Sequence, residues 1–170
     1  MTSKLLLKNI LRGPLTEPAP APDPAALAEQ LKRASQARLG RSLSIREVDA
    51  GSCNGCELEI HALNNVLYDL ERFGLRFVAS PRHADVLLVT GPVTVNMREA
   101  LERTYQATPG PKWVVAVGDC ARNGGVFAGS PAVVGGVSNV LAVDLHIPGC
   151  PPSPEALLKG LLALVESVAR

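Results

Sequence analysis

Short apolar runs alternate with amphipathic stretches from Ser44 to the end of the chain. Runs with strand character cover 44–48, 75–79, 85–91, 112–118 and 140–147. Apolar residues recur at helical spacing over 56–74, 94–108 and 153–169. In the first of these helices, Val66 and Leu67 fall on the apolar face. The alternation predicts right-handed β-α-β crossovers and an α/β fold with a mostly parallel sheet, helices on both faces, over residues 44–170.

The first 43 residues have a different composition. Five prolines fall within "PLTEPAPAPDP" (14–24), which favours an extended spacer, and Pro24 and Gly40 are placed to start and end a helix. Residues 1–48 hold eight Lys or Arg against four acids. Nothing in this region has to pack on the domain that follows. Residues 1–43 are therefore expected to form a Pro-rich, basic N-terminal arm that wraps a partner.

Composition narrows the class of protein. The 170 residues are 46% apolar and carry a net charge of +1, which argues against binding to nucleic acid. A chain of this length buries a core without disulfide staples. It has neither an apolar run of the roughly 18 residues that span a membrane nor a secretory cleavage site. We expect a cytoplasmic chain whose four cysteines stay reduced and serve as ligands or catalysts.

All four cysteines follow predicted strands. Cys53 and Cys56 come after the run 44–48, Cys120 comes after 112–118, and Cys150 comes after 140–147. The carboxyl ends of parallel strands share one edge of a sheet, where such folds bind their ligands. The four side chains are therefore expected to converge.

Several kinds of site could use these cysteines. A [4Fe-4S] cluster accepts ligands from well-separated loops, whereas four-cysteine zinc sites usually use two CxxC pairs and this chain has one. The prolines of "PGCPP" and the glycines near each cysteine also favour the cluster. A CxxC that opens a helix after a strand is also the pattern of thioredoxin-like dithiol oxidoreductases, although that would leave Cys120 and Cys150 unexplained. The residues favour the cluster and leave zinc, a dithiol or inert cysteines open.

Four ordered motifs carry a resemblance to a known family. They are "GSCNGCELEI", "SPRHADVLLVTGPVT", "VAVGDCARNGG" and "VDLHIPGCPPSPEALLKGLLAL". In order and spacing, over about residues 44 to 165, they resemble the small electron-transfer subunit shared by respiratory complex I (its 20 kDa subunit) and the membrane-bound [NiFe] hydrogenases. The resemblance implies a flavodoxin-like fold that binds one [4Fe-4S] cluster through Cys53, Cys56, Cys120 and Cys150.

The spacing of the first two cysteines separates the branches of that family. Complex I has two adjacent cysteines, whereas here Asn54 and Gly55 stand between them, a form similar to the formate hydrogenlyase, hydrogenase-4 and energy-converting hydrogenase subunits. His83 replaces the glutamine typical of complex I relatives, which counts against quinone binding.

Four further residues are expected to surround the cluster. Glu59 matches a glutamate that follows the second ligand in complex I. Its two candidate roles are a proton path and bracing of the loop, and the structural role is the expectation. Arg82, His83 and Arg122 are candidates to face the cluster or a partner, with His83 placed to tune it by charge.

The resemblance also implies a function and partners. The chain would relay electrons through its cluster to or from a [NiFe] hydrogenase large subunit (49 kDa-like). Further partners would be a ferredoxin-like iron-sulfur subunit and membrane ion-pump-like subunits, so the chain would lie in the cytoplasm as a peripheral protein on the inner face of the cell membrane. A complex I-like NADH:quinone oxidoreductase subunit that passes electrons to quinone is the first alternative. A stand-alone thioredoxin-like dithiol oxidoreductase is the second.

Overall fold

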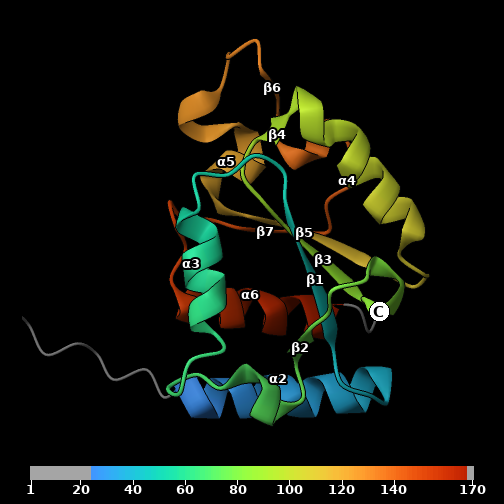
Figure 1. Cartoon of the computed structure of the whole chain (residues 1–170). Helices are drawn as coiled ribbons and strands as arrows, with labels where there is room; N and C mark the ends of the chain where they lie inside the picture. The colour runs from blue at the N-terminus through green and yellow to red at the C-terminus, as the bar shows by residue number, and fades with distance from the viewer. Residues whose placement is uncertain (1–23, 168–170) are drawn as a thin grey trace, which may run out of the picture.

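The computed structural model describes residues 24–167 (Figure 1), so the Pro-rich segment before Pro24 lies outside the described residues. Strands and helices alternate along the described chain, with short 3-10 helices labelled η. Their order is α2 (Pro24–Leu39), β1 (Ser44–Asp49), α3 (Gly55–Ala62), η1 (Leu70–Phe73), β2 (Arg76–Phe77), η2 (Pro81–His83), β3 (Val86–Thr90), β4 (Val93–Thr94), α4 (Val95–Ala107), β5 (Trp113–Val117), α5 (Gly118–Asn123), η3 (Gly125–Phe127), β6 (Val133–Gly135), η4 (Val137–Asn139), β7 (Leu145–Ile147) and α6 (Pro154–Ser167).

The main sheet has five strands in the order β2-β1-β3-β5-β7, and every neighbouring pair is parallel. Numbered within this sheet alone, the order is 2-1-3-4-5, which is the flavodoxin-like arrangement. The α/β prediction is therefore confirmed. The structure adds a two-stranded antiparallel sheet of β4 and β6, which the hydrophobic pattern does not predict.

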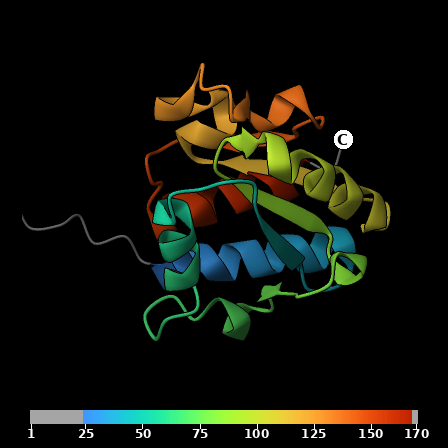
Figure 2. The same cartoon turned by 45° about the horizontal axis from the view of Figure 1, so that its top comes forward.

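Helices cover both faces of the sheet, as Figures 1 and 2 show. One apolar cluster joins the sheet to α2, α3, η1 and α6, and a second joins the other face to α4, α5 and η4. Strand β3 is buried over its whole length, because its side chains alternate between the two clusters. The central strand thus anchors both halves of the core.

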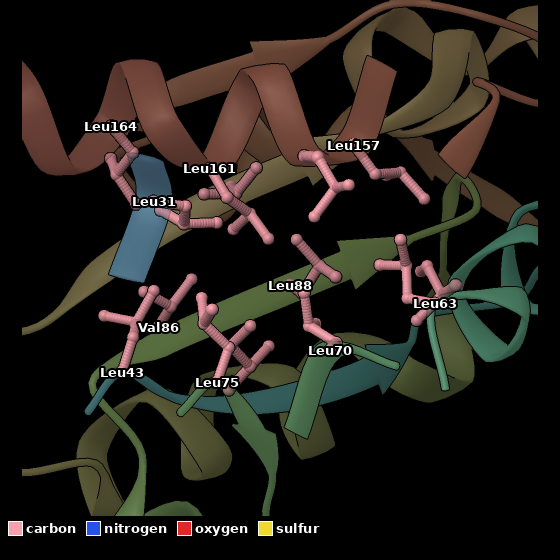
Figure 3. Close-up of a cluster of buried hydrophobic side chains, with 14 of the residues drawn as sticks. Leu31, Leu43, Leu63, Leu70, Leu75, Val86, Leu88, Leu157, Leu161 and Leu164 are labelled. Carbon is pink, nitrogen blue, oxygen red and sulfur yellow. The ribbon is translucent and has the colours of Figure 1, made fainter. Parts of the chain in front are cut away.

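Helix α2 lies where the sequence pattern predicts a helix, but it is not part of a free arm. Ala28 and Leu31 are fully buried, and Figure 3 shows Leu31 beside Leu161 and Leu164 of α6. Burial of these side chains removes apolar surface from water and holds α2 on the domain. The arm expected over residues 1–43 is therefore corrected for 24–39, which form part of the folded unit.

The helix predicted over 56–74 is also corrected, because α3 ends at Ala62. The Asn65 side chain accepts hydrogen bonds from the backbone N–H groups of Leu67 (2.8 Å) and Tyr68 (3.0 Å). Such local bonds compete with helix continuation. Val66 and Leu67, expected on the buried face, are 100% and 66% exposed instead.

Two strands are shorter than predicted. β2 has two residues and β7 has three, whereas the strands β1, β3 and β5 and the helices α4 and α6 lie close to their predicted positions. Residues 137–139 form the turn η4 ahead of β7, and the Asp144 carboxylate accepts the backbone N–H of Val114 at 2.7 Å. The Asp144 side chain therefore accepts a β5 hydrogen bond that the backbone of a longer β7 would accept.

No helix within residues 24–167 is both long enough and apolar enough to cross a membrane.

Candidate functional site

The carboxyl ends of the central strands line up across the sheet. The registers pair Asp49 with Thr90, Thr90 with Val117, and Val117 with Ile147. The four cysteines follow this row on three loops, after β1, β5 and β7. Strand β3, between β1 and β5, is not followed directly by a cysteine.

The loop after β1 crosses over the end of β3 to reach β5. Gly91 directly follows β3 at φ 72°, and a Cβ atom there would lie 2.6 Å from the backbone nitrogen of Ser52. The Thr94 N–H also donates to the carbonyl of Ala50 at 2.9 Å. Because Gly91 has no side chain, the backbone at Ser52 passes directly above it, which carries Cys53 and Cys56 toward the loops of β5 and β7.

Local hydrogen bonds shape this crossing loop. The Asp49 carboxylate accepts from the backbone N–H groups of Gly51 and Ser52, both at 2.7 Å, in the manner of an Asx turn. Asn54 then adopts a left-handed conformation at φ 70°, which asparagine tolerates better than most residues. Helix α3 begins immediately afterwards and places Cys56 in its first turn.

The loop after β5 packs directly against two of the sulfur atoms. A Cβ atom on Gly118 would lie 2.7 Å from the Sγ of Cys56, and one on Gly125 would lie 2.7 Å from the Sγ of Cys120. Both glycines have positive φ, at 84° and 51°. The Val126 backbone N–H donates to the Cys120 sulfur. Backbone therefore forms the wall of the site where side chains would collide with the thiols.

Two hydrogen bonds join the loops after β5 and β7, one between backbone groups and one to the Asp119 side chain. The Asp119 N–H donates to the carbonyl of Gly149 at 2.9 Å, and the Gly149 N–H donates to the Asp119 carboxylate at 3.2 Å. Cys120 directly follows Asp119, and Cys150 directly follows Gly149. The reciprocal pair of hydrogen bonds therefore holds the two cysteines at the same level of the sheet edge.

The thiols are close enough to affect one another electrostatically. Burial raises the pKa of the Cys56 thiol to about 12, and Glu57, Cys120, Cys53 and Cys150 act in the same direction. Burial also raises the pKa of Cys120, again with Cys150 and Cys53 contributing, while the Val126 N–H opposes the shift. A cation among the cysteines would offset this effect and favour the thiolate forms of Cys56 and Cys120.

A hollow of about 480 Å³ opens at this edge, and Arg122 lies in its wall. The other lining residues are Asp119, Cys120, Asn123, Gly125, Val126 and Cys150. Cys53 and Cys150 are exposed, whereas Cys56 and Cys120 are only partly so. The side chain of Arg122 forms no ion pair within the described residues, so its charge is available to an anion in the hollow.

This donor set fits a cubane better than a single ion. Within residues 24–167, no group of three or more His, Cys, Asp and Glu side chains is placed to hold one metal ion. A [4Fe-4S] cluster needs four thiolates spread more widely than the shell of one zinc ion, with N–H groups and little side-chain bulk around the sulfurs. The glycine backbone against Cys56 and Cys120 has these properties.

The other predicted site residues divide between the two ends of the sheet. Glu59 lies on α3 three residues after Cys56, and Arg122 lies on α5 beside Cys120. Arg82 and His83 lie in η2, before β3 begins, so the five residues of β3 (about 16 Å) separate them from the cysteine edge. The structure therefore does not bring Arg82 and His83 to the cysteines. The sequence placed them before a strand, and a parallel sheet sends the two ends of a strand to opposite edges.

Sequence reasoning missed Glu57, a buried acid beside Cys56. Its side chain is only 6% exposed, and neither carboxylate oxygen has a hydrogen-bond partner among the described residues. Nothing in "GCELE" distinguishes a buried Glu57 from an exposed one. Asp49 was missed as well, although an aspartate just before "AGS" at the end of a strand is a recognisable turn signal.

A five-stranded parallel sheet with four cysteines at its carboxyl edge defines a small α/β subunit of the kind found in oxidoreductase complexes. The chain belongs to the family described as NADH ubiquinone oxidoreductase, 20 Kd subunit, whose model matches residues 53–164. The resemblance read from the motifs is thereby confirmed.

Relatives in this family come from several complexes. The chain is 48% identical over 132 residues to the probable membrane-bound hydrogenase subunit mbhJ of Pyrococcus furiosus, covering 78% of this chain and 79% of that protein. It is 48% identical to formate hydrogenlyase subunit 7 of Escherichia coli, covering 72% of this chain and 48% of that one. It is 49% identical to an NADH-quinone oxidoreductase subunit of Citrifermentans bemidjiense, covering 67% of this chain and 66% of that one.

A solved structure shows the same fold. A chain of the membrane-bound sulfane sulfur reductase, an archaeal respiratory membrane complex, superposes with a TM-score of 0.67 at 35% identity. The match covers 82% of this chain and 75% of that one.

Proposed function

We propose that the chain is the electron-transfer subunit of a membrane-associated oxidoreductase complex and holds one [4Fe-4S] cluster through Cys53, Cys56, Cys120 and Cys150. The observation that carries the proposal is the position of these cysteines, which follow β1, β5 and β7 at one edge of the sheet. The effect of the other three thiols on the pKa of Cys56 agrees with it. Membership of the 20 kDa subunit family supports it.

The residues of the chain would act as a fixed shell around this site. When bound, a [4Fe-4S] cluster takes up and releases one electron at a time. The Val126 N–H at the Cys120 sulfur and the Arg122 side chain would stabilise negative charge there. The close backbone at Gly118 and Gly125 would limit the access of water to the sulfurs of Cys56 and Cys120. Hydrogen bonds within the chain hold these loops, which would limit their movement when an electron enters or leaves the site.

For the partner, we propose a [NiFe] hydrogenase large subunit, with a ferredoxin-like iron-sulfur subunit as the other electron carrier and ion-pump-like subunits in the membrane. Asn54 and Gly55, which separate the first two cysteines, support the hydrogenase branch. The likeness to mbhJ over 78% of the chain agrees with it. The chain would then lie peripherally on the cytoplasmic face of the membrane.

A cysteine series tests the cluster. After anaerobic reconstitution, the unaltered chain should contain about four irons and four sulfides and give the EPR signal of a reduced cubane. Cys120→Ser or Cys150→Ser should lose or convert the cluster as fully as Cys53→Ser. Ala142→Ser, a change of similar size at an exposed residue outside the cysteine loops, is the control. Full cluster retention in Cys120→Ser or Cys150→Ser would refute the four-ligand assignment. An unaltered chain that takes up no iron would favour the dithiol alternative.

The partner is tested separately by purifying the complex through a tag on this chain. Stoichiometric nickel in the purified complex is the expected result. A complex without nickel that reduces quinone would establish the complex I-like alternative. The 49% identity to the NADH-quinone oxidoreductase relative supports this alternative. This outcome would leave the cluster assignment intact.

A further inference from the structure

A second polar hollow lies at the amino-terminal edge of the sheet, opposite the cysteines. It measures about 230 Å³. Its lining residues, which we call the basic pocket, are Arg41, Arg76, Arg82, His83, Ala84, Asp85 and Pro109. A neighbouring hollow of about 410 Å³ shares Arg41 and Arg76.

The single acid of the basic pocket is already neutralised. Asp85 is buried, and its carboxylate accepts from both terminal nitrogens of Arg41, at 3.1 Å from Nη1. It also accepts the backbone N–H of Ser44 at 2.9 Å. A bidentate pair with an additional N–H donor satisfies this carboxylate. Asp85 is therefore not available to balance the remaining cations.

The remaining cations have no acidic partner among the described residues. Arg76 uses its Nε to donate to the Ser44 hydroxyl at 3.3 Å, which leaves its terminal nitrogens without a partner in that part of the chain. The side chains of Arg82 and His83 form no hydrogen bond or ion pair within residues 24–167. The terminal nitrogens of Arg76 and the side chains of Arg82 and His83 thus border one hollow without a hydrogen-bond partner in the described part of the chain.

This arrangement differs from the rest of the described surface. Most exposed cations on the helices lie one turn from a carboxylate, as in the pairs Arg33–Glu29, Arg98–Glu102, Arg103–Glu99 and Lys159–Glu155. Arg122, which has no such pair within residues 24–167, lies at the proposed cluster site, where an anion is expected. Three arginines without an ion pair in the described chain, Arg76, Arg82 and Arg122, therefore line hollows that can hold an anion. Arg46 of β1 also lacks an ion pair there but lines neither of these two hollows.

The chemistry of the pocket favours phosphate over carboxylate. Arg76 and Arg82 come from two separate segments, strand β2 and η2, while Arg41 in the turn after α2 is engaged by Asp85. A planar carboxylate offers two oxygens to such a set, whereas a tetrahedral phosphate offers several oxygens in different directions and can meet more than one guanidinium fork. We propose that the basic pocket binds the phosphate group of a free phosphate or a phosphoester.

The pocket can be tested without disturbing the cluster, because the length of β3 lies between the two sites. The unaltered full chain, carrying its cluster, is titrated with inorganic phosphate by calorimetry at low ionic strength. The double variant Arg76→Gln/Arg82→Gln should bind phosphate at least about tenfold more weakly, with iron content unchanged. The control Arg98→Gln/Arg103→Gln loses the same charge from α4 and should bind within about twofold of the unaltered chain.

Vesicles distinguish the source of the phosphate. The chain is sedimented with vesicles of phosphatidylcholine alone and with vesicles containing phosphatidylglycerol. Binding to the phosphatidylglycerol vesicles that Arg76→Gln/Arg82→Gln abolishes and the control keeps supports the proposal with a lipid headgroup as ligand. Saturable binding of inorganic phosphate with no vesicle binding supports it with a soluble ligand.

Two results would overturn the proposal. One is equal phosphate binding by Arg76→Gln/Arg82→Gln and the unaltered chain, or no binding of phosphate and phosphatidylglycerol by either. The other is tighter binding of a poly-glutamate peptide than of phosphate at this pocket, which would indicate an acidic protein partner. Loss of the cluster in the cysteine series would not bear on either result.

Discussion

Among single residues, Gly91 determines whether the cysteines meet. The crossing loop can pass over the end of β3 only because residue 91 has no Cβ atom, and the nearest atoms belong to the backbone, which cannot rotate away. A side chain there would push Cys53 away from the loops of β5 and β7. The proposed cluster would therefore depend on Gly91, a residue that would not itself bind it.

We predict that Gly91→Ala destabilises the chain and lowers its iron content after reconstitution. Gly129→Ala is the matched control, since Gly129 also has positive φ, 82°, but nothing lies within 4 Å of its Cβ position. The control should lose about 1–2 kcal/mol of unfolding free energy from left-handed strain and keep its iron. Urea unfolding and iron analysis measure both effects, and a Gly91→Ala chain that matches the control would contradict the crossing-loop argument.

The Cys56 thiol provides a pH test. Its pKa is raised to about 12, chiefly by burial, so in the iron-free folded chain Cys56 stays protonated at neutral pH. Its folded-state pKa lies above its ordinary value. The contribution of the buried neutral Cys56 thiol to the free energy of unfolding is thus fully present below the ordinary pKa of a thiol. It is lost as the pH rises toward about 12.

Because the thiolate is the nucleophile, iodoacetamide should alkylate Cys56 slowly in the folded iron-free chain and much faster in urea at the same pH. Peptide mass mapping measures the modification at each pH. Equal rates at neutral pH in the folded chain and in urea would show that burial does not protect this thiol.

The sequence could predict the four cysteines and their common edge, because each follows an apolar run and parallel strands have a fixed polarity. It could not predict the burial of Glu57, since that depends on how α3 packs on the sheet. Arg82 was expected to face the cluster or a partner. Its place before β3 puts it at the edge of the sheet opposite the cysteines.

At the level of elements, α2 is the main difference between pattern and structure. Its sequence predicts the helix but not its contact with α6, because an amphipathic face does not reveal what it covers. The helix predicted over 56–74 ends early because the Asn65 side chain accepts hydrogen bonds from the backbone of the following residues. Periodicity alone does not include such competition between side chain and backbone.

We predict that Leu31→Ala lowers the unfolding free energy by about 2–5 kcal/mol, because it opens a cavity between α2 and α6. Gln30→Ala, an exposed neighbour on the same helix, should change it by less than about 0.5 kcal/mol. Urea unfolding of both variants measures the difference. A Leu31→Ala chain as stable as the control would show that α2 does not belong to the folded unit.

For the whole molecule, exposed apolar side chains near the cysteine edge indicate the face that a partner covers. Val126 is 82% exposed and follows the Cys120 loop, with Phe127 beside it at 41%. Val66 is fully exposed but lies beyond the far end of α3. In the proposed complex, the surface at Val126 should contact the large subunit, and Val66 should not.

We therefore predict that Val126→Ser weakens association with the large subunit about tenfold, which corresponds to loss of one buried valine side chain. Val66→Ser, at an equally apolar exposed position, should leave association unchanged. Co-purification yield at several salt concentrations measures both. A stronger effect of Val66→Ser would move the interface to the other end of α3.

The unequal exposure of the four cysteines gives the site a rim and a floor. Cys53 and Cys150 form the rim, and the half-buried Cys56 and Cys120 form the floor. Iron delivered from solvent would meet the rim first, so the proposed cluster would be built most easily before a partner covers this edge. Oxidants would arrive by the same route and would reach Cys53 and Cys150 before Cys56 and Cys120.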